Sequence, residues 1–97
     1  MSNFYNTINL DGKNLARAIN NAKTQAERIL LIFKSQDIAM TPDHVHRLYI
    51  QYFYNVPLTS IRRAIHNLTD AECLEKTNRM AMGRYGKPNY KWKLKSK

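Results

Sequence analysis

The feature of this 97-residue sequence that most constrains its fold is a strict alternation close to its end. In the stretch GRYGKPNYKWKL, residues 83–94, a turn with two glycines and a proline is followed by Tyr90, Trp92 and Leu94 with lysines between them. Successive residues of a strand point to opposite sides, so the three apolar side chains share one face and the lysines share the other. We therefore expect residues 74–82 and 89–95 to pair across the turn as a β-hairpin whose apolar face docks on a core.

Two helix start signals precede the hairpin. Thr24 and Glu27 have the spacing of a capping box, in which the threonine hydroxyl accepts from the Glu27 amide and the carboxylate reaches back. A helix is therefore predicted from about residue 25. Thr41 followed by Pro42 combines an N-cap residue with a proline at the first helical position, which predicts a second start.

Each predicted helix carries an apolar stripe at helical spacing, which indicates a shared core. The third helix follows the NVP motif at 55–57 and spans about residues 57–70. The stripe residues are Ala26, Ile29, Leu30 and Phe33 in the first helix, Val45, Leu48, Tyr49 and Tyr52 in the second, and Leu58, Ile61, Ala64, Ile65 and Leu68 in the third. With Leu31 off the stripe and Ile32 at its edge, the first helix is either central or in contact with a second layer.

The residues before Thr24 have a weaker pattern. Leu15, Ile19 and Ala22 are spaced as a narrow apolar stripe, which predicts a short helix that needs a partner for stability. Residues 1–10 are either an extended arm or a frayed end. We divide the chain into an N-terminal arm and short helix, residues 1–23, for packing or dimerisation, and one domain, residues 24–97. The expected fold class is mainly α with a small C-terminal β-hairpin.

The positive charge of the chain is concentrated in its last quarter. The formal net charge is +9, from 16 Lys and Arg against 7 Asp and Glu. Residues 76–97 contain eight of the Lys and Arg residues and none of the acidic ones. A field of one sign attracts polyanions and speeds their encounter, so nucleic acid or an acidic surface is the leading class of partner.

Other classes of function have little support in the residues. No apolar run approaches the roughly 18 residues that a membrane span needs, so no membrane partner is expected. The lone Cys73 makes an internal disulfide impossible and favours a reducing compartment, and we expect a cytoplasmic location in a bacterial cell or a phage-infected host. His44 and His46 diverge on a helix and no cluster completes a metal site. We expect neither an enzyme nor a cofactor.

The order of three capped helices and a basic hairpin resembles the winged helix-turn-helix fold of bacterial and phage DNA-binding proteins. The segment VPLTSIRRAIHNLTDAECLEKT, residues 56–77, and the segment GRYGKPNYKWKL carry the resemblance, which covers roughly residues 24–94. It implies three core helices and a wing, with the third helix in the major groove and the hairpin on backbone or minor groove. The chain departs from the family at Glu72, where a glycine usually ends the third helix, so we expect the helix to end around Asn67 or Asp70.

The resemblance places DNA contacts on the third helix and on the turn. On a helical wheel Thr59, Arg63, His66 and Asn67 face outward, with Ser60 and Arg62 on the flanks. Arginine bonds guanine bidentately and asparagine pairs with adenine, so Arg63 and Asn67 are predicted base contacts, while Arg62 is better placed for phosphate. The predicted DNA-binding residues are Thr59, Ser60, Arg62, Arg63, His66 and Asn67 on the helix, and Arg84, Tyr85, Lys87, Lys91 and Lys93 on the turn and its following strand.

The prediction from the sequence is therefore a sequence-specific binder of double-stranded DNA, acting in transcription or replication. One alternative is a winged-helix interaction module whose basic hairpin grips an acidic protein, and another is an RNA binder. An exposed Ile50 and Tyr54 would favour a protein contact. A homodimer through the N-terminal helix is the expected form of any self-association.

Overall fold

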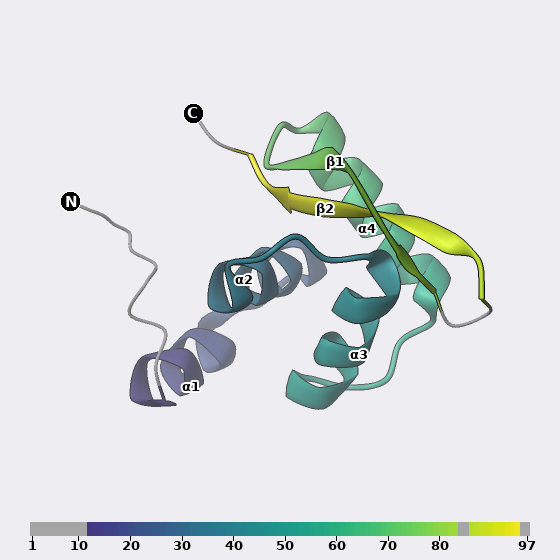
Figure 1. The fold of residues 1–97 in the computed structure, drawn as a ribbon. Coiled ribbons are helices and arrows are strands. Elements are labelled where there is room, and N and C mark those ends of the chain that lie inside the picture. The colour runs from purple at the N-terminus through teal and green to yellow at the C-terminus, as the bar shows by residue number, and fades with distance from the viewer. Residues whose placement is uncertain (1–11, 84–85, 96–97) are drawn as a thin grey trace.

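The computed structural model describes residues 12–83 and 86–95 of the chain. Within them, four helices are followed by a two-stranded antiparallel hairpin (Figure 1). The elements are α1 (Gly12–Asn21), α2 (Gln25–Gln36), α3 (Pro42–Tyr52), α4 (Leu58–Asp70), β1 (Leu74–Met82) and β2 (Pro88–Leu94). The predicted class, mainly helical with a C-terminal hairpin, is confirmed at this level.

The helix starts follow the capping signals. The Thr24 hydroxyl accepts from the Glu27 amide at 3.1 Å, and the Glu27 carboxylate accepts from the Thr24 amide at 3.0 Å. The Thr41 hydroxyl accepts from the His44 amide at 3.2 Å, with Pro42 as the first helical residue. Both predicted starts are confirmed, and each cap satisfies an amide that a helix N-terminus leaves without an intrahelical partner.

The core lies where α2, α3 and α4 meet the base of the hairpin. Its buried residues are Ile29, Ile32, Phe33, Met40, Val45, Tyr49, Ile61, Ile65, Leu68, Leu74 and Trp92. One expectation for α2 was wrong: Ala26 is exposed, because it lines a hollow between α2 and α4. Ile32, at the edge of the stripe, is fully buried. α2 is the central helix, one of the two predicted alternatives, since it contacts α3, α4 and β2 at once. In the described part of the chain, the main packing partner of α1 is α2.

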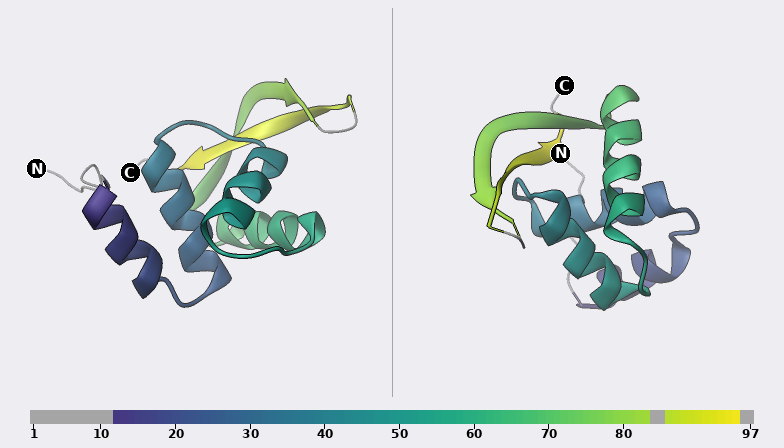
Figure 2. Two further views of the ribbon diagram at one scale, coloured as in Figure 1. Left: turned by 90° about the horizontal axis from the view of Figure 1, so that it is seen from below. Right: turned by 90° about the vertical axis from the view of Figure 1, so that its right-hand side faces the viewer.

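β2 has backbone pairing partners along both of its edges. Leu74 pairs with Leu94 and Lys76 with Trp92, and on its other side Trp92 exchanges two backbone hydrogen bonds of 2.8 Å with Met40, in the loop between α2 and α3. Trp92 is only 7% exposed, as the alternation predicts. Tyr90, expected on the same core face, is 40% exposed, because a hollow separates it from Arg62 and His66 of α4. Figure 2 shows the part of the hairpin toward its turn standing apart from the helices.

α4 ends in a left-handed residue that joins it directly to β1. Glu72 has a φ of 64°, its amide donates to the Thr69 carbonyl at 3.0 Å, and the Cys73 amide donates to the Leu68 carbonyl at 2.9 Å. This is a Schellman arrangement with glutamate where glycine is usual. Of the two predicted helix ends, Asn67 and Asp70, the structure has Asp70. The expectation that Glu72 would make the helix end differently was wrong, because Glu72 itself takes the left-handed conformation. The Lys95 ammonium lies 3.0 Å from the Glu72 carboxylate and so ties this corner to the chain after β2.

Candidate nucleic-acid interface

The outward face of α4 is a row of exposed hydrogen-bonding side chains. Thr59, Arg62, Arg63, His66 and Asn67 are all exposed, as the helical wheel predicts. On the opposite side of the same turns Ile61 and Ile65 are fully buried, which fixes the rotation of the helix about its axis. Thirteen residues at about 1.5 Å each make a rod roughly 20 Å long. The rod therefore presents donors and acceptors along its length in a fixed orientation.

Ser60 does not belong to this exposed row. It is half-buried, and its hydroxyl accepts from the Gln25 amide group on α2 at 3.1 Å. This pair was not predicted, because the two residues are 35 positions apart and no local pattern links them. Beyond the pair, Arg63 and Asn67 border a shallow hollow of about 310 Å³ between α2 and α4. Ser60 is therefore a link that holds the start of α4 against α2.

The other flank of α4 borders a hollow that the hairpin shares. Its volume is about 220 Å³, and its lining residues are Pro42, Arg62, Ile65, His66, Pro88, Asn89, Tyr90 and Trp92. The imidazole of His66 meets the indole of Trp92 edge to face, with ring centroids 6.0 Å apart. Arg62 and His66 thus lie on the same side of the molecule as the first three residues of β2. We refer to this feature as the wing hollow.

The cationic residues of the hairpin divide between its two ends. Lys87 is exposed and directly precedes Pro88, which lines the wing hollow. Lys93 lies elsewhere: it borders a separate hollow with Asp37 and Ile38, and its ammonium is 3.8 Å from the Glu75 carboxylate. Alternation turns Lys93 away from the Trp92 face, as the sequence predicts, so Lys93 does not line the wing hollow. A contact of Lys93 with DNA stays a prediction.

Lys91 lies between these two ends, near α3. Partial burial lowers the pKa of His44 below the usual imidazole value, and the positive charges of Arg47 and Lys91 lower it further, whereas the Asp43 carboxylate has the opposite effect. The predicted contacts Arg84 and Tyr85 lie outside the described residues. Of the predicted hairpin contacts among the described residues, Lys87 is therefore the one next in sequence to a lining residue of the wing hollow.

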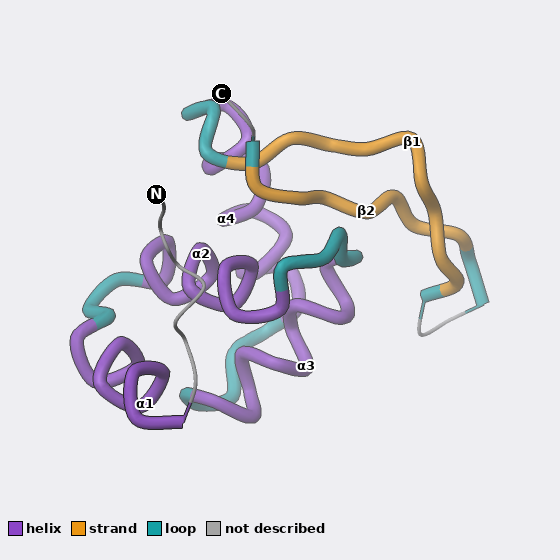
Figure 3. Tube along the Cα trace, turned by 60° about the vertical axis from the view of Figure 1, so that its left-hand side comes forward, coloured by secondary structure: helices purple, strands orange, loops and turns teal. Residues whose placement is uncertain are grey.

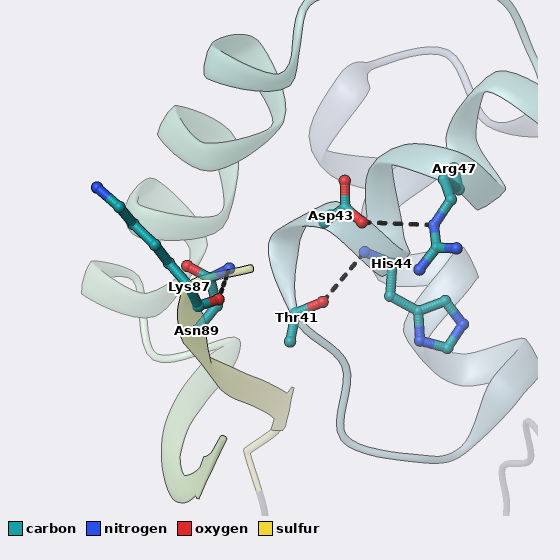
Figure 4. Close-up of polar contacts among 6 residues, drawn as sticks. All are labelled: Thr41, Asp43, His44, Arg47, Lys87 and Asn89. Carbon is teal, nitrogen blue, oxygen red and sulfur yellow. Dashed lines mark hydrogen bonds and ion pairs between the residues drawn. The ribbon is translucent and has the colours of Figure 1, made fainter. Parts of the chain in front are cut away.

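Sequence reasoning missed the N-terminal end of α3 as part of this surface. Figure 4 shows Thr41, Asp43, His44 and Arg47 at this end, with Lys87 and Asn89 of the hairpin beside it. The Arg47 guanidinium is 3.5 Å from the Asp43 carboxylate and its side chain is largely exposed. The Thr41-Pro42 signal could have placed a helix N-terminus, whose amides favour anions, but not its position next to the hairpin.

The turn of the hairpin is held by the backbone of Lys87. Its carbonyl accepts from the Gly83 amide at 2.8 Å and from the Asn89 side-chain amide at 3.4 Å. A Cβ at Gly83 would meet the Asn89 amide nitrogen, so a side chain there would displace Asn89. These bonds hold the backbone at Lys87 in place.

Comparison with known proteins found no matching family model, curated protein or solved structure. Among residues 12–83 and 86–95, none of the helices has the length and apolar character needed to cross a membrane. In the same part of the chain, no three His, Cys, Asp or Glu side chains gather as metal ligands would. His46 instead hydrogen-bonds the Val56 carbonyl through Nε2 at 2.6 Å, and so ties α3 to the turn before α4.

Proposed function

We propose that this chain is a winged helix-turn-helix domain that binds double-stranded DNA sequence-specifically, with α4 in the major groove and the hairpin as its wing. The observation that carries the proposal is the wing hollow, which brings the outward side of α4 and the start of β2 to one side of the molecule. A duplex that receives α4 in a groove about 12 Å wide would meet the hairpin on the neighbouring backbone.

The exposed residues of α4 divide by the contacts they can make. Arg63 and Asn67 are suited to base edges, because guanidinium bonds guanine O6 and N7 together and a carboxamide pairs with adenine. Arg62, on the flank at the wing hollow, is placed for a phosphate between the two grooves. Thr59, in the first turn of α4, adds a hydroxyl beside backbone amides that suit a second phosphate.

The charge of the chain favours a polyanion over an acidic protein of ordinary size. With a net charge of +9, the chain neutralises several phosphates and releases their counterions, which gives affinity a steep salt dependence. The proposed biological role is a small regulator of transcription or a replication factor in the cytoplasm of a bacterium or a phage-infected cell.

The experiment that tests the proposal is selection of bound duplexes from a random pool, followed by titration of the enriched duplex. An enriched motif with nanomolar to submicromolar binding supports sequence-specific recognition. Binding without any enriched motif would remove the specific half of the proposal. No duplex binding at about 50 mM salt, where electrostatic attraction is strong, would refute it altogether. Preferred binding of structured RNA would replace it with the RNA alternative.

A second candidate, a contact with a protein, is favoured by the C-terminal end of α3. Ile50 is 38% exposed and Tyr54 is 53% exposed, the pattern predicted to favour such a contact. The Arg28 guanidinium donates to the Tyr54 hydroxyl at 2.6 Å and holds it in place. The test is co-sedimentation with a protein partner. If Ile50→Ser and Tyr54→Ser abolish it and leave duplex binding unchanged, the end of α3 is a separate binding surface. Dimerisation through α1 stays a prediction, since the side chain of Leu15 lies outside the described part of the chain.

A further inference from the structure

The tip of the hairpin carries an apolar strip that the core does not cover. Met80 pairs with Tyr90 and Met82 pairs with Pro88, and residues paired across two strands share a face. Met80 is 47% exposed and Met82 is 68% exposed, with Tyr90 and Pro88 exposed beside them. We name these four residues the wing strip.

The wing strip continues the core face of the hairpin toward its turn, where a hollow separates that face from α4. The regular register breaks between Lys76 and Met80, where the Thr77 hydroxyl accepts from the Arg79 amide and donates to the Lys91 carbonyl. Irregularities of this kind bend a strand, and Figure 3 shows β1 turning sharply part-way along its length. The bend leaves Tyr90 and Pro88 on the wall of the wing hollow, opposite Arg62 and His66 of α4.

One cation lies on the wing strip, and two more follow its strands. The Lys76 ammonium lies 4.1 Å from the centroid of the Tyr90 ring. Arg79 and Lys87 are exposed and directly precede Met80 and Pro88 in the sequence. A narrow apolar surface between positive charges is complementary to the minor groove of a duplex, in which apolar sugar edges lie between two rows of phosphates. An acidic protein surface offers the negative charges without the apolar surface between them.

We propose that the wing strip enters the minor groove next to the major groove that holds α4, and that Met80 and Met82 press on a base step and bend the duplex. This inference rests on the proposed function and adds to it a component of recognition through DNA shape. Unstacking costs least at flexible pyrimidine–purine steps. The chain therefore prefers such steps at base pairs that no side chain of α4 reaches.

The wing hollow supplies the geometry for both contacts at once. One phosphate backbone separates adjacent major and minor grooves, and the hollow of about 220 Å³ separates α4 from the wing strip. Arg62 and His66 line it on the helix side, where a passing backbone meets a cation and a hydrogen-bonding ring. Its apolar walls, Ile65 and Trp92, belong to the core and keep its shape fixed.

The test measures bending and affinity separately. A duplex of about 30 base pairs that carries the selected motif is labelled with a dye at each end, and energy transfer reports its bend on binding. Wild type and Met82→Leu, which keeps an apolar side chain of similar size, are expected to bend it. The double variant Met80→Ala, Met82→Ala is expected to bind about tenfold more weakly and to leave the duplex nearly straight, with an unchanged salt dependence. Ile38→Ala, which removes an exposed apolar side chain at the opposite end of β2, is the control.

Three results overturn the inference. Unchanged bending by the double alanine variant shows that the wing strip does not act on DNA, while the proposed function stands. If the wild-type chain self-associates without DNA and the double variant is monomeric, a second copy of the chain covers the strip. Failure of the wild type to bind any duplex refutes the proposed function and this inference together.

Discussion

The base and the tip of the hairpin are built from the same alternating pattern and have opposite surroundings. At the base, Leu74 and Trp92 are buried against the helices, whereas at the tip Met82 and Tyr90 lie on the same face of the sheet and are exposed. The alternation determines which side chains share a face, but the bend of the hairpin decides how much of that face packs on the helices. Apolar residues at the base therefore stabilise the fold, and those at the tip are available for a ligand.

The largest expected effect is the loss of stability caused by a substitution at the base of the hairpin. Trp92→Ala is expected to lower the free energy of unfolding by about 3–5 kcal/mol, because it removes a large core side chain and leaves a cavity. Met82→Ala is expected to change it by less than about 0.5 kcal/mol, as for other surface substitutions. Urea unfolding followed by circular dichroism measures both. Similar values for the two variants would contradict the division into base and tip.

The next effect concerns recognition by α4. Arg63→Ala is expected to cost about 1–3 kcal/mol of binding to the selected duplex and to relax the preference at one base pair. Arg17→Ala, which removes an exposed charge on α1, is the matched control. Fluorescence anisotropy with the selected duplex and with single-base variants gives both quantities. Equal losses for the two arginine variants would mean that the charge matters and the position does not.

A smaller effect is expected on the salt dependence of DNA binding, which should differ between the two ends of the hairpin. Lys87→Ala is expected to weaken binding to all duplexes alike and to reduce the slope of log K against log salt by roughly 0.9, the contribution of one phosphate. Lys93→Ala is expected to leave the slope unchanged, because Lys93 borders a different hollow and lies near Glu75. A slope that falls equally for both lysines would place the duplex along the whole hairpin.

The smallest effect concerns the pH dependence of stability through His44. Partial burial, with Arg47 and Lys91 nearby, keeps the pKa of His44 in the folded chain below its usual value of 6.5. The unfolded chain therefore binds a proton at a higher pH than the folded chain, and stability decreases as pH falls below about 6.5. The His44→Gln variant is expected to show a shallower decrease than wild type between pH 7 and pH 5, in thermal unfolding. Parallel curves for the two proteins would contradict this assignment.

Local signals in the sequence were sufficient for the elements of the fold. Thr24 with Glu27, and Thr41 with Pro42, act through hydrogen bonds and backbone angles within one turn, so they set helix starts whatever surrounds them. Long-range contacts were not readable in the same way. The Ser60–Gln25 pair, the exposure of Tyr90 and the position of the start of α3 beside the hairpin all depend on how the elements pack.

The candidate interface was predicted to a similar extent. Helical periodicity placed Arg63, His66 and Asn67 outward and Arg62 on the flank, because Ile61 and Ile65 must face the core. The apolar character of the tip was missed, since Met80 and Met82 belong to a strand whose alternation Lys76 and Asn78 interrupt. Only the register with Tyr90 and Pro88 shows that they share a face.

The central claim is that one duplex contacts the outward side of α4 and the tip of the hairpin together. Its most direct test is titration of the isotope-labelled chain with the selected duplex, followed by NMR of the backbone amides. We predict that signals of residues 59–67 and 86–90 shift together at one stoichiometry, while those of α1 stay in place. Shifts confined to the end of α3 around Ile50 and Tyr54, or to only one of the two predicted segments, would contradict the claim.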